Sequence, residues 1–310
     1  RSAKGHAFAE RKPTFTRRGA RLSISPVAVV FFLLLVVVPL VALVVVVARS
    51  RLSPIQCFLW AVAYLLCKFL WRARWLNEPT LAEGQGGIIV CNHRSSVDPF
   101  FIQTATGRKI HWMVAREYCQ HPAFRGFLAT CEVIPVGRGG VDTAATKAAI
   151  RLAASGEIVG MLPEGRINMS EEFMLPVRPG AALVAMKAGV PVVPCYIQGA
   201  PYRRYPWSPL LMSARVEVRF GEPLDPTKFC GPAGEEGGAQ QFTLEILKAI
   251  AKLAGRSDFE PRIAGRNWKP TAEELDAAMD AKERRDAAEK LAGPNGNRES
   301  GVRSQGSGAS

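Results

Sequence analysis

A cluster of polar residues follows a short apolar run near residue 90, and two of its members could transfer a proton. Residues 88–99 read IIVCNHRSSVDP, in which four residues separate His93 from Asp98. At a junction of strand, loop and helix, this spacing lets the carboxylate reach the imidazole, fix its tautomer and raise the basicity of the other ring nitrogen. Such a pair can take a proton from an alcohol. Two simpler interpretations stay open: Asp98 before Pro99 could be a helix N-cap, and a lone histidine in a turn needs no chemical role.

Four short motifs in order resemble the glycerolipid acyltransferase family of the 1-acylglycerol-3-phosphate acyltransferase type. Asn92 and His93 together with Asp98 resemble the NHxxxxD signature of that family. The second, third and fourth family blocks are similar to IPVGR at 134–138, LPEGR at 162–166 and VPVVP at 190–194. The resemblance extends over residues 76–225, and four motifs in order are far more specific than one.

The third block departs from the family pattern, in which Thr-Arg follows Glu-Gly. Here the pair is Arg166-Ile167, so the arginine is displaced by one position or Arg178 has taken over its role. The resemblance implies that Arg138 and Arg166 clamp the phosphate of the acceptor, because guanidinium binds phosphate bidentately, and that Glu164 and Gly165 shape that site. Without the motif, each arginine would be interpreted as a solvated loop charge. The departure leaves the identity of the acceptor open.

The resemblance also implies a mechanism. His93 acts as general base on the free hydroxyl of a lysophospholipid, and Asp98 orients it and stabilises the imidazolium. The alkoxide attacks an acyl thioester, and the tetrahedral oxyanion requires hydrogen-bond donors nearby. Coenzyme A or acyl carrier protein leaves. The acyl thioester is a substrate, so we expect no metal and no bound organic cofactor.

The elements that must position these residues alternate between strands and helices. Short apolar runs predict strands, and amphipathic runs predict helices. The predicted strands are 87–91, 110–115, 133–136, 158–162, 190–197 and 215–220. The predicted helices are 99–106, 122–130, 141–154, 179–188 and 242–253, the fourth of them capped by Gly189. This order predicts an α/β fold, with a largely parallel sheet flanked by helices and sites at the C-terminal ends of its strands.

The net charge of +13 belongs almost entirely to the N-terminal quarter of the chain. Residues 1–75 contain twelve Lys or Arg residues against one acid, Glu10. The segment Pro26–Ala48 has no charge and, as a helix of about 34 Å, could cross a bilayer core; a signal peptide and a buried helix of a soluble protein are the alternatives. Ile55–Trp71 is shorter and rich in aromatic residues, which favours the membrane interface or the returning arm of a hairpin. A core helix of the soluble domain is its alternative.

The chain divides into four predicted parts. These are a basic, disordered tail (1–25), two membrane-anchoring helices (26–75), a catalytic domain (76–258) and a polar tail, partly helical and then disordered (259–310). The seven cysteines form no CxxC motif and no zinc spacing, which favours a reducing compartment. Outside residues 1–75 the charge is nearly balanced, which argues against nucleic acid as a partner.

The sequence therefore predicts a membrane-associated acyltransferase whose catalytic domain faces the cytoplasm. The predicted acceptor is 1-acylglycerol 3-phosphate, which yields phosphatidate, and the predicted donor is acyl-CoA or acyl carrier protein. A different lysophospholipid acceptor and an inactive lipid-binding relative are the alternatives. A hairpin or in-plane anchor is favoured, because a single span would put the basic N-terminus on the outer side, against the usual charge rule.

Overall fold

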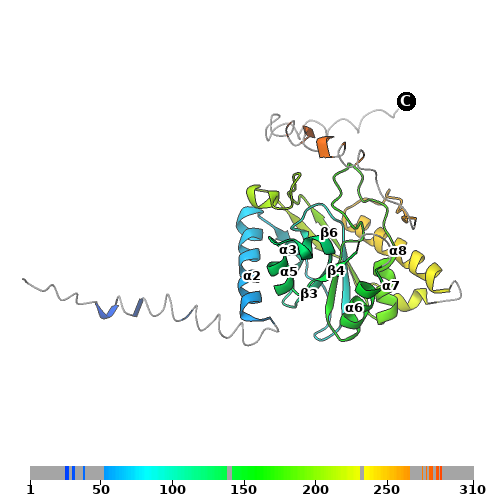
Figure 1. Cartoon of the computed structure of the whole chain (residues 1–310), viewed down its shortest axis with the longest axis horizontal. Helices are drawn as coiled ribbons and strands as arrows, with labels where there is room; N and C mark the ends of the chain where they lie inside the picture. Colours follow the sequence, from blue (N-terminus) through cyan, green and yellow to red (C-terminus); the bar gives the residue numbers. More distant parts are fainter. Residues whose placement is uncertain are drawn as a thin grey trace, which may run out of the picture. The chain divides into compact units, whose positions relative to one another are not determined.

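The structure is a computed structural model that describes residues 25–27, 30–31, 38, 52–137, 142–230 and 234–265, with isolated positions between 274 and 287 (Figure 1). By contacts, the chain divides into residues 1–49 and residues 50–310. Most of the predicted tail 1–25, of the segment Pro26–Ala48 and of the tail 259–310 lies outside the described residues. No helix within the described residues is both long enough and apolar enough to cross a membrane.

Within the described residues, seven strands form one sheet, in the spatial order β1–β7–β6–β2–β5–β3–β4. The strands are β1 Arg74–Trp75, β2 Gly87–Cys91, β3 Ile110–Ala115, β4 Ile134–Val136, β5 Ile158–Met161, β6 Val192–Gln198 and β7 Glu217–Phe220. Neighbouring strands are parallel except β6 and β7, which are antiparallel. The predicted α/β fold with a largely parallel sheet is confirmed, and β2 lies at its centre.

Helices cover both faces of the sheet (Figure 1). The α-helices are α2 Pro54–Leu65, α3 Asp98–Gln103, α4 Arg116–Gln120, α5 Arg125–Thr130, α6 Thr143–Ala154, α7 Gly180–Ala188 and α8 Gly234–Leu253. A π-helical turn, η1 (Leu66–Leu70), continues α2, and two 3₁₀ turns, η2 (Ser208–Leu211) and η3 (Pro226–Phe229), lie further along the chain.

The two layers of the core are built from alternating residues of the same strands, because successive side chains of a strand point to opposite faces. In β2, Ile88 and Val90 join a core formed with α6, α7 and α8. Ile89 and Cys91 join a second core, which contains Trp71 and residues of η1 and α3. All five residues of β2 are buried, so the strand that precedes His93 is held from both sides.

The apolar segment 55–71 forms α2 and η1, and one side of it packs on the domain. Cys57, Ala63 and Cys67 are buried, and Trp60 Nε1 donates to the Gln103 carbonyl at 3.3 Å. Strand β1 follows directly and pairs with β7, so the sequence-based boundary at residue 76 falls just after a strand of the sheet. The helix itself begins at a capping box in which Ser53 and Gln56 satisfy each other's backbone amides.

Most predicted elements are confirmed within a few residues, and the exceptions have physical reasons. The predicted helix 122–130 begins only at Arg125, and residues 116–120 form the separate helix α4. His121 is extended, as expected for a residue before proline, and so it separates the two helices. Helix α8 begins eight residues before the predicted Phe242, in a glycine-rich stretch. There a Cβ on Gly238 would lie 2.2 Å from the Phe229 carbonyl oxygen, so close packing requires glycine.

Candidate active site

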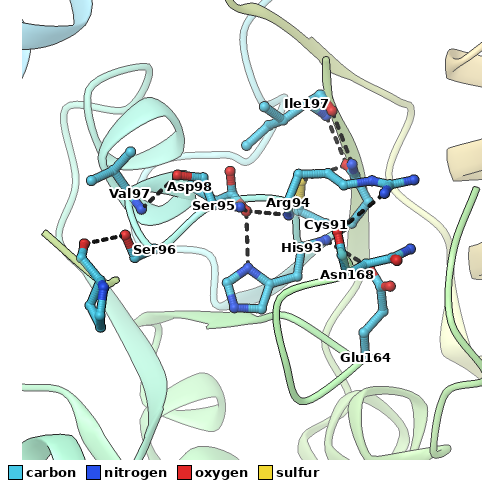
Figure 2. A network of polar contacts seen from close by, with 12 residues as sticks. Cys91, His93, Arg94, Ser95, Ser96, Val97, Asp98, Glu164, Asn168 and Ile197 are labelled. Carbon is cyan, nitrogen blue, oxygen red and sulfur yellow. Dashed lines mark hydrogen bonds and ion pairs between the residues drawn. The ribbon is translucent and has the colours of Figure 1, made fainter. Parts of the chain in front are cut away.

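The sheet brings His93 and Asp98 together at the C-terminal end of its central strand. Strand β2 ends at Cys91, the chain turns through residues 92–98, and α3 begins at Asp98. The His93 Nδ1 atom lies 2.9 Å from the Asp98 Oδ2 atom (Figure 2). Asp98 is fully buried, whereas 15% of the His93 side chain is exposed. The imidazole therefore has a buried carboxylate on one nitrogen and access to solvent.

The Asp98 carboxylate also organises the turn itself. Its Oδ2 atom accepts hydrogen bonds from the backbone amides of Arg94 and Ser95, at 2.7 and 2.8 Å. Three donors thus converge on one carboxylate oxygen, counting the His93 ring. Asp98 is not the N-cap of α3: that position is Val97, and no side chain caps the helix. The capping interpretation of Asp98 is therefore wrong, because the carboxylate points back into the turn.

Asn92 fastens the beginning of the turn to the neighbouring strand β6. Its Nδ2 donates to the Ile197 carbonyl at 2.9 Å, and its Oδ1 accepts from the Ile197 amide at 2.8 Å. The side chain thus extends the sheet pairing by one step beyond Cys91, which is the register partner of Cys195. Apart from the position of Asn92 in the motif, no sequence pattern predicted this role.

Glu164 lies against the backbone of His93. Its Oε1 accepts from the His93 amide at 2.7 Å, and its Oε2 accepts from the Leu175 amide at 2.9 Å. Burial raises the pKa of the Glu164 carboxyl to about 7, and these hydrogen bonds oppose the rise only in part. Both oxygens face backbone amides, so the structure places Glu164 as a support of the turn. Gly165 follows it in an exposed turn with a φ of +68°.

Arg94 is half-buried against the loop that follows β5. Its guanidinium donates to four backbone carbonyls, those of Asn168, Ser170, Glu172 and Phe173. Desolvation by burial lowers the pKa of this arginine. The Asn168 amide in turn donates to the His93 carbonyl at 2.7 Å, so the loop and the 92–98 turn hold each other in place. Sequence analysis missed Arg94, because its carbonyl partners carry no side-chain signal.

The arginines expected to bind phosphate are less closely defined. Arg138 lies outside the described residues. Arg166 is half-buried in the loop after β5, directly after Gly165, and Arg178 is half-buried just before α7. The loop of Arg166 is thus the one that contacts the 92–98 turn through Glu164 and Asn168.

A cavity of about 210 Å³ lies beside the turn, at the end of β6. Its lining residues are Asn92, Arg94, Phe173, Tyr196, Ile197, Gln198, Gly199 and Ala200.

The other histidines that the structure describes have ordinary structural surroundings. His111 is buried with Nδ1 2.9 Å from the Glu132 carbonyl, and His121 is exposed. The described residues contain no group of His, Cys, Asp and Glu that could hold a metal ion.

Parts of this chain are similar to known acyltransferases. Residues 72–198, which include the whole 92–98 turn, match the family model described as Acyltransferase. The chain is 29% identical, over 183 residues, to the 1-acyl-sn-glycerol-3-phosphate acyltransferase of Bacillus subtilis (strain 168), covering 59% of this chain and 88% of the relative.

A solved structure has the same fold. It is the 1-acyl-sn-glycerophosphate (LPA) acyltransferase, PlsC, from Thermotoga maritima, with a TM-score of 0.51 and 17% sequence identity. The match covers 74% of this chain and 93% of that one. At this identity the likeness concerns the fold alone.

Proposed function

Because this chain is similar to the glycerolipid acyltransferase family of the 1-acylglycerol-3-phosphate acyltransferase type, we propose that it acylates the free hydroxyl of 1-acylglycerol 3-phosphate and yields phosphatidate. The observation that carries the proposal is the 2.9 Å contact between His93 Nδ1 and the buried Asp98 carboxylate. A charged partner on Nδ1 keeps Nε2 as the nitrogen that accepts a proton.

His93 takes the hydroxyl proton of the acceptor on Nε2 as the oxygen attacks the carbonyl carbon of the thioester. A carbon–oxygen bond forms, and the tetrahedral intermediate collapses by breaking the carbon–sulfur bond. The leaving thiolate takes the proton from the imidazolium, so that His93 returns to its neutral state. Asp98 stabilises the imidazolium in between, and its two backbone donors keep it in the orientation that this role requires.

The acyl donor in this proposal is acyl-CoA or an acyl carrier protein. Either supplies an activated acyl thioester, so the reaction needs neither a metal nor an organic cofactor. Arg138 and Arg166 bind the acceptor phosphate. Glu164 and Gly165 shape that site. Glu164 does so indirectly, by accepting hydrogen bonds from the backbone amides of His93 and Leu175.

An acyltransferase assay with a panel of acceptors tests the proposal. Radiolabelled acyl-CoA or acyl carrier protein is offered with lysophosphatidate and with lysophospholipids of other headgroups, to wild type, His93→Ala and His121→Ala. We expect lysophosphatidate to be the best acceptor, His93→Ala to lose activity by about 10²- to 10⁴-fold, and the exposed His121→Ala to keep it. Preference for another headgroup would support the different acceptor that the altered third block suggests. Undiminished turnover by His93→Ala would refute the mechanism.

We further propose that the protein works at a membrane surface. Five apolar residues form an exposed stripe along α2 and η1 at alternating spacings of three and four residues, here called the α2 stripe: Ile55, Phe58, Val62, Leu65 and Phe69. This spacing puts them on one side of the helix, opposite the buried Cys57 and Cys67. An apolar stripe of this kind, followed by Arg72 and Arg74, suits an interface of acyl chains and anionic headgroups.

A further inference from the structure

The connection between β6 and β7, residues 199–216, exposes aromatic, aliphatic and basic side chains together. Tyr205, Trp207 and Leu210 are about half exposed, and Leu211 is 77% exposed. Arg203 and Arg204 are exposed beside them, and no ion pair of theirs occurs within the described residues. The proposed chemistry of His93 uses none of these side chains.

This exposure belongs to an ordered structure. The Ser208 hydroxyl accepts from the Arg203 amide at 2.9 Å and donates to the Arg203 carbonyl at 2.6 Å. The rings of Tyr205 and Trp207 stack in parallel, with centroids 5.4 Å apart. The connection therefore holds its apolar side chains outward in a fixed arrangement, whereas a merely solvated loop has no reason to present two adjacent leucines to water.

The connection is fastened to the turn that contains His93. The Ser95 hydroxyl donates to the Pro201 carbonyl at 2.5 Å, and the Ser96 hydroxyl donates to the Pro206 carbonyl at 2.6 Å. Both serines lie between His93 and Asp98 in the sequence. Any surface that the connection touches is therefore close to the 92–98 turn.

The connection is also fastened to the end of the α2 stripe. Trp71 Nε1 donates to the Pro209 carbonyl at 3.0 Å, and Arg72 Nε donates to the Ala214 carbonyl at 3.0 Å. In Figure 1 the yellow-green segment accordingly lies at the upper end of α2. The exposed residues of the connection and those of α2 and η1 are thus neighbouring parts of one apolar and basic surface.

We propose that the 199–216 connection is a second docking element for an anionic lipid surface, and that it brings that surface to the turn of His93. The inference rests on the proposed function, because it assumes a lipid acceptor. Leu210, Leu211 and the stacked rings suit the acyl-chain boundary, and Arg203 and Arg204 suit phosphate headgroups. An acidic donor protein would use the two arginines, but it gives no reason for the exposed leucines or for continuity with the α2 stripe.

The first test measures contact with lipid directly. Full-length protein is added to vesicles of phosphatidylcholine and phosphatidylglycerol in which the acyl chains carry bromine, a short-range quencher of tryptophan. Trp207→Phe is compared with wild type, so that the difference reports on Trp207. We expect a quenched component that disappears in Trp207→Phe. Equal quenching of both proteins would overturn the proposal.

The second test separates docking from chemistry. Leu210→Ser/Leu211→Ser and Arg203→Ser/Arg204→Ser are compared with Leu76→Ser, an exposed leucine outside the connection. Activity is measured on acceptor in anionic vesicles, and on a short-chain acceptor below its critical micelle concentration. Each arginine removed should lower partitioning to anionic vesicles about fivefold. Activity on the monomeric acceptor should stay at the wild-type level for all variants.

The outcomes distinguish the two proposals. Equal losses on vesicle and monomeric acceptor would overturn the docking role, and so would the same loss in Leu76→Ser. A loss that appears only with acyl carrier protein as donor, on both acceptor forms, would assign the surface to that protein instead. If wild type acylates no acceptor, the proposed function fails, while the bromolipid measurement still decides whether Trp207 enters lipid.

Discussion

At the scale of single residues, Asp98 should matter more for rate than for binding. Asp98→Asn leaves an oxygen that can accept from the backbone amides of Arg94 and Ser95, but it removes the charge that faces His93. We expect kcat to fall about 10²- to 10⁴-fold, with little change in KM for the acceptor. Steady-state kinetics and thermal unfolding of the same preparation check this. A variant that keeps wild-type kcat would show that the carboxylate only shapes the turn.

Glu164 gives a second prediction, on the pH dependence of stability. Burial raises the pKa of Glu164 to about 7 in the folded protein, above the value of 4.5 for an ordinary glutamate. The folded state then binds the proton more tightly than the unfolded state. This tighter proton binding stabilises the folded state, and its contribution to the free energy of unfolding is fully present below pH 4.5. The contribution is lost as pH rises through 7, and the loss is on the order of 3 kcal/mol.

The measurement is denaturant unfolding of wild type and Glu164→Gln from pH 5 to pH 8. The free energy of unfolding of wild type relative to Glu164→Gln should fall as pH rises. Because the glutamine NH₂ group must face either the His93 or the Leu175 amide, the variant should also lose activity. A difference between the two proteins that does not vary with pH would contradict the raised pKa.

The sequence predicted the His93–Asp98 contact but only part of its surroundings. Spacing suffices for this pair, because only four residues lie between its members. Asn92, Arg94 and Glu164 depend on partners 71 to 105 positions away, which no local pattern reveals. The resemblance implied that Glu164 shapes the phosphate site, and this stays a prediction; the backbone partners of both its oxygens could not be predicted from the sequence. The roles of Arg138 and Arg166 remain predictions.

At the scale of elements, the loop after β5 depends on Arg94. Lysine has one nitrogen with three donors and cannot reach four carbonyls that are spread over six residues. We expect Arg94→Lys to lower the free energy of unfolding by about 2–3 kcal/mol. The amides of Asn168 and Leu175 should lose protection from hydrogen exchange, as followed by mass spectrometry. The exposed Arg125→Lys serves as the matched control, and equal exchange in both variants would contradict this role.

The strands of the sheet were predicted well, because buried parallel strands are continuous apolar runs with clear ends. Strand β1 was missed, since two residues, Arg74 and Trp75, are too few to show any period. The short helix α4 was missed for a similar reason: it has five residues, none of them buried. The start of α8 was missed because tertiary packing at Gly238 overrides the weak helix propensity of glycine.

At the scale of the whole molecule, the α2 stripe should govern membrane affinity. Phe58→Ser/Leu65→Ser removes two exposed side chains without touching the buried side of α2. Each of the two substitutions should weaken partitioning into vesicles about tenfold, because each removes apolar surface that membrane binding would transfer out of water. Vesicle flotation measures this, with Leu76→Ser as the control. The effect should persist at high salt, whereas that of Arg203→Ser/Arg204→Ser should shrink. Unchanged flotation of the double variant would assign the stripe another partner.

The supports of the 92–98 turn are separated from it along the chain, and this has a consequence for synthesis. Asn92 bonds to Ile197, 105 positions later, and Ser96 bonds to Pro206, 110 positions later. Strand β1 finds its partner only in β7, after residue 216. A growing polypeptide therefore carries His93 and Asp98 out of the ribosome long before the strands that hold them exist. We expect translation products that end before β7 to contain both side chains but to lack these contacts, so acyl transfer should begin only after β7 has been made.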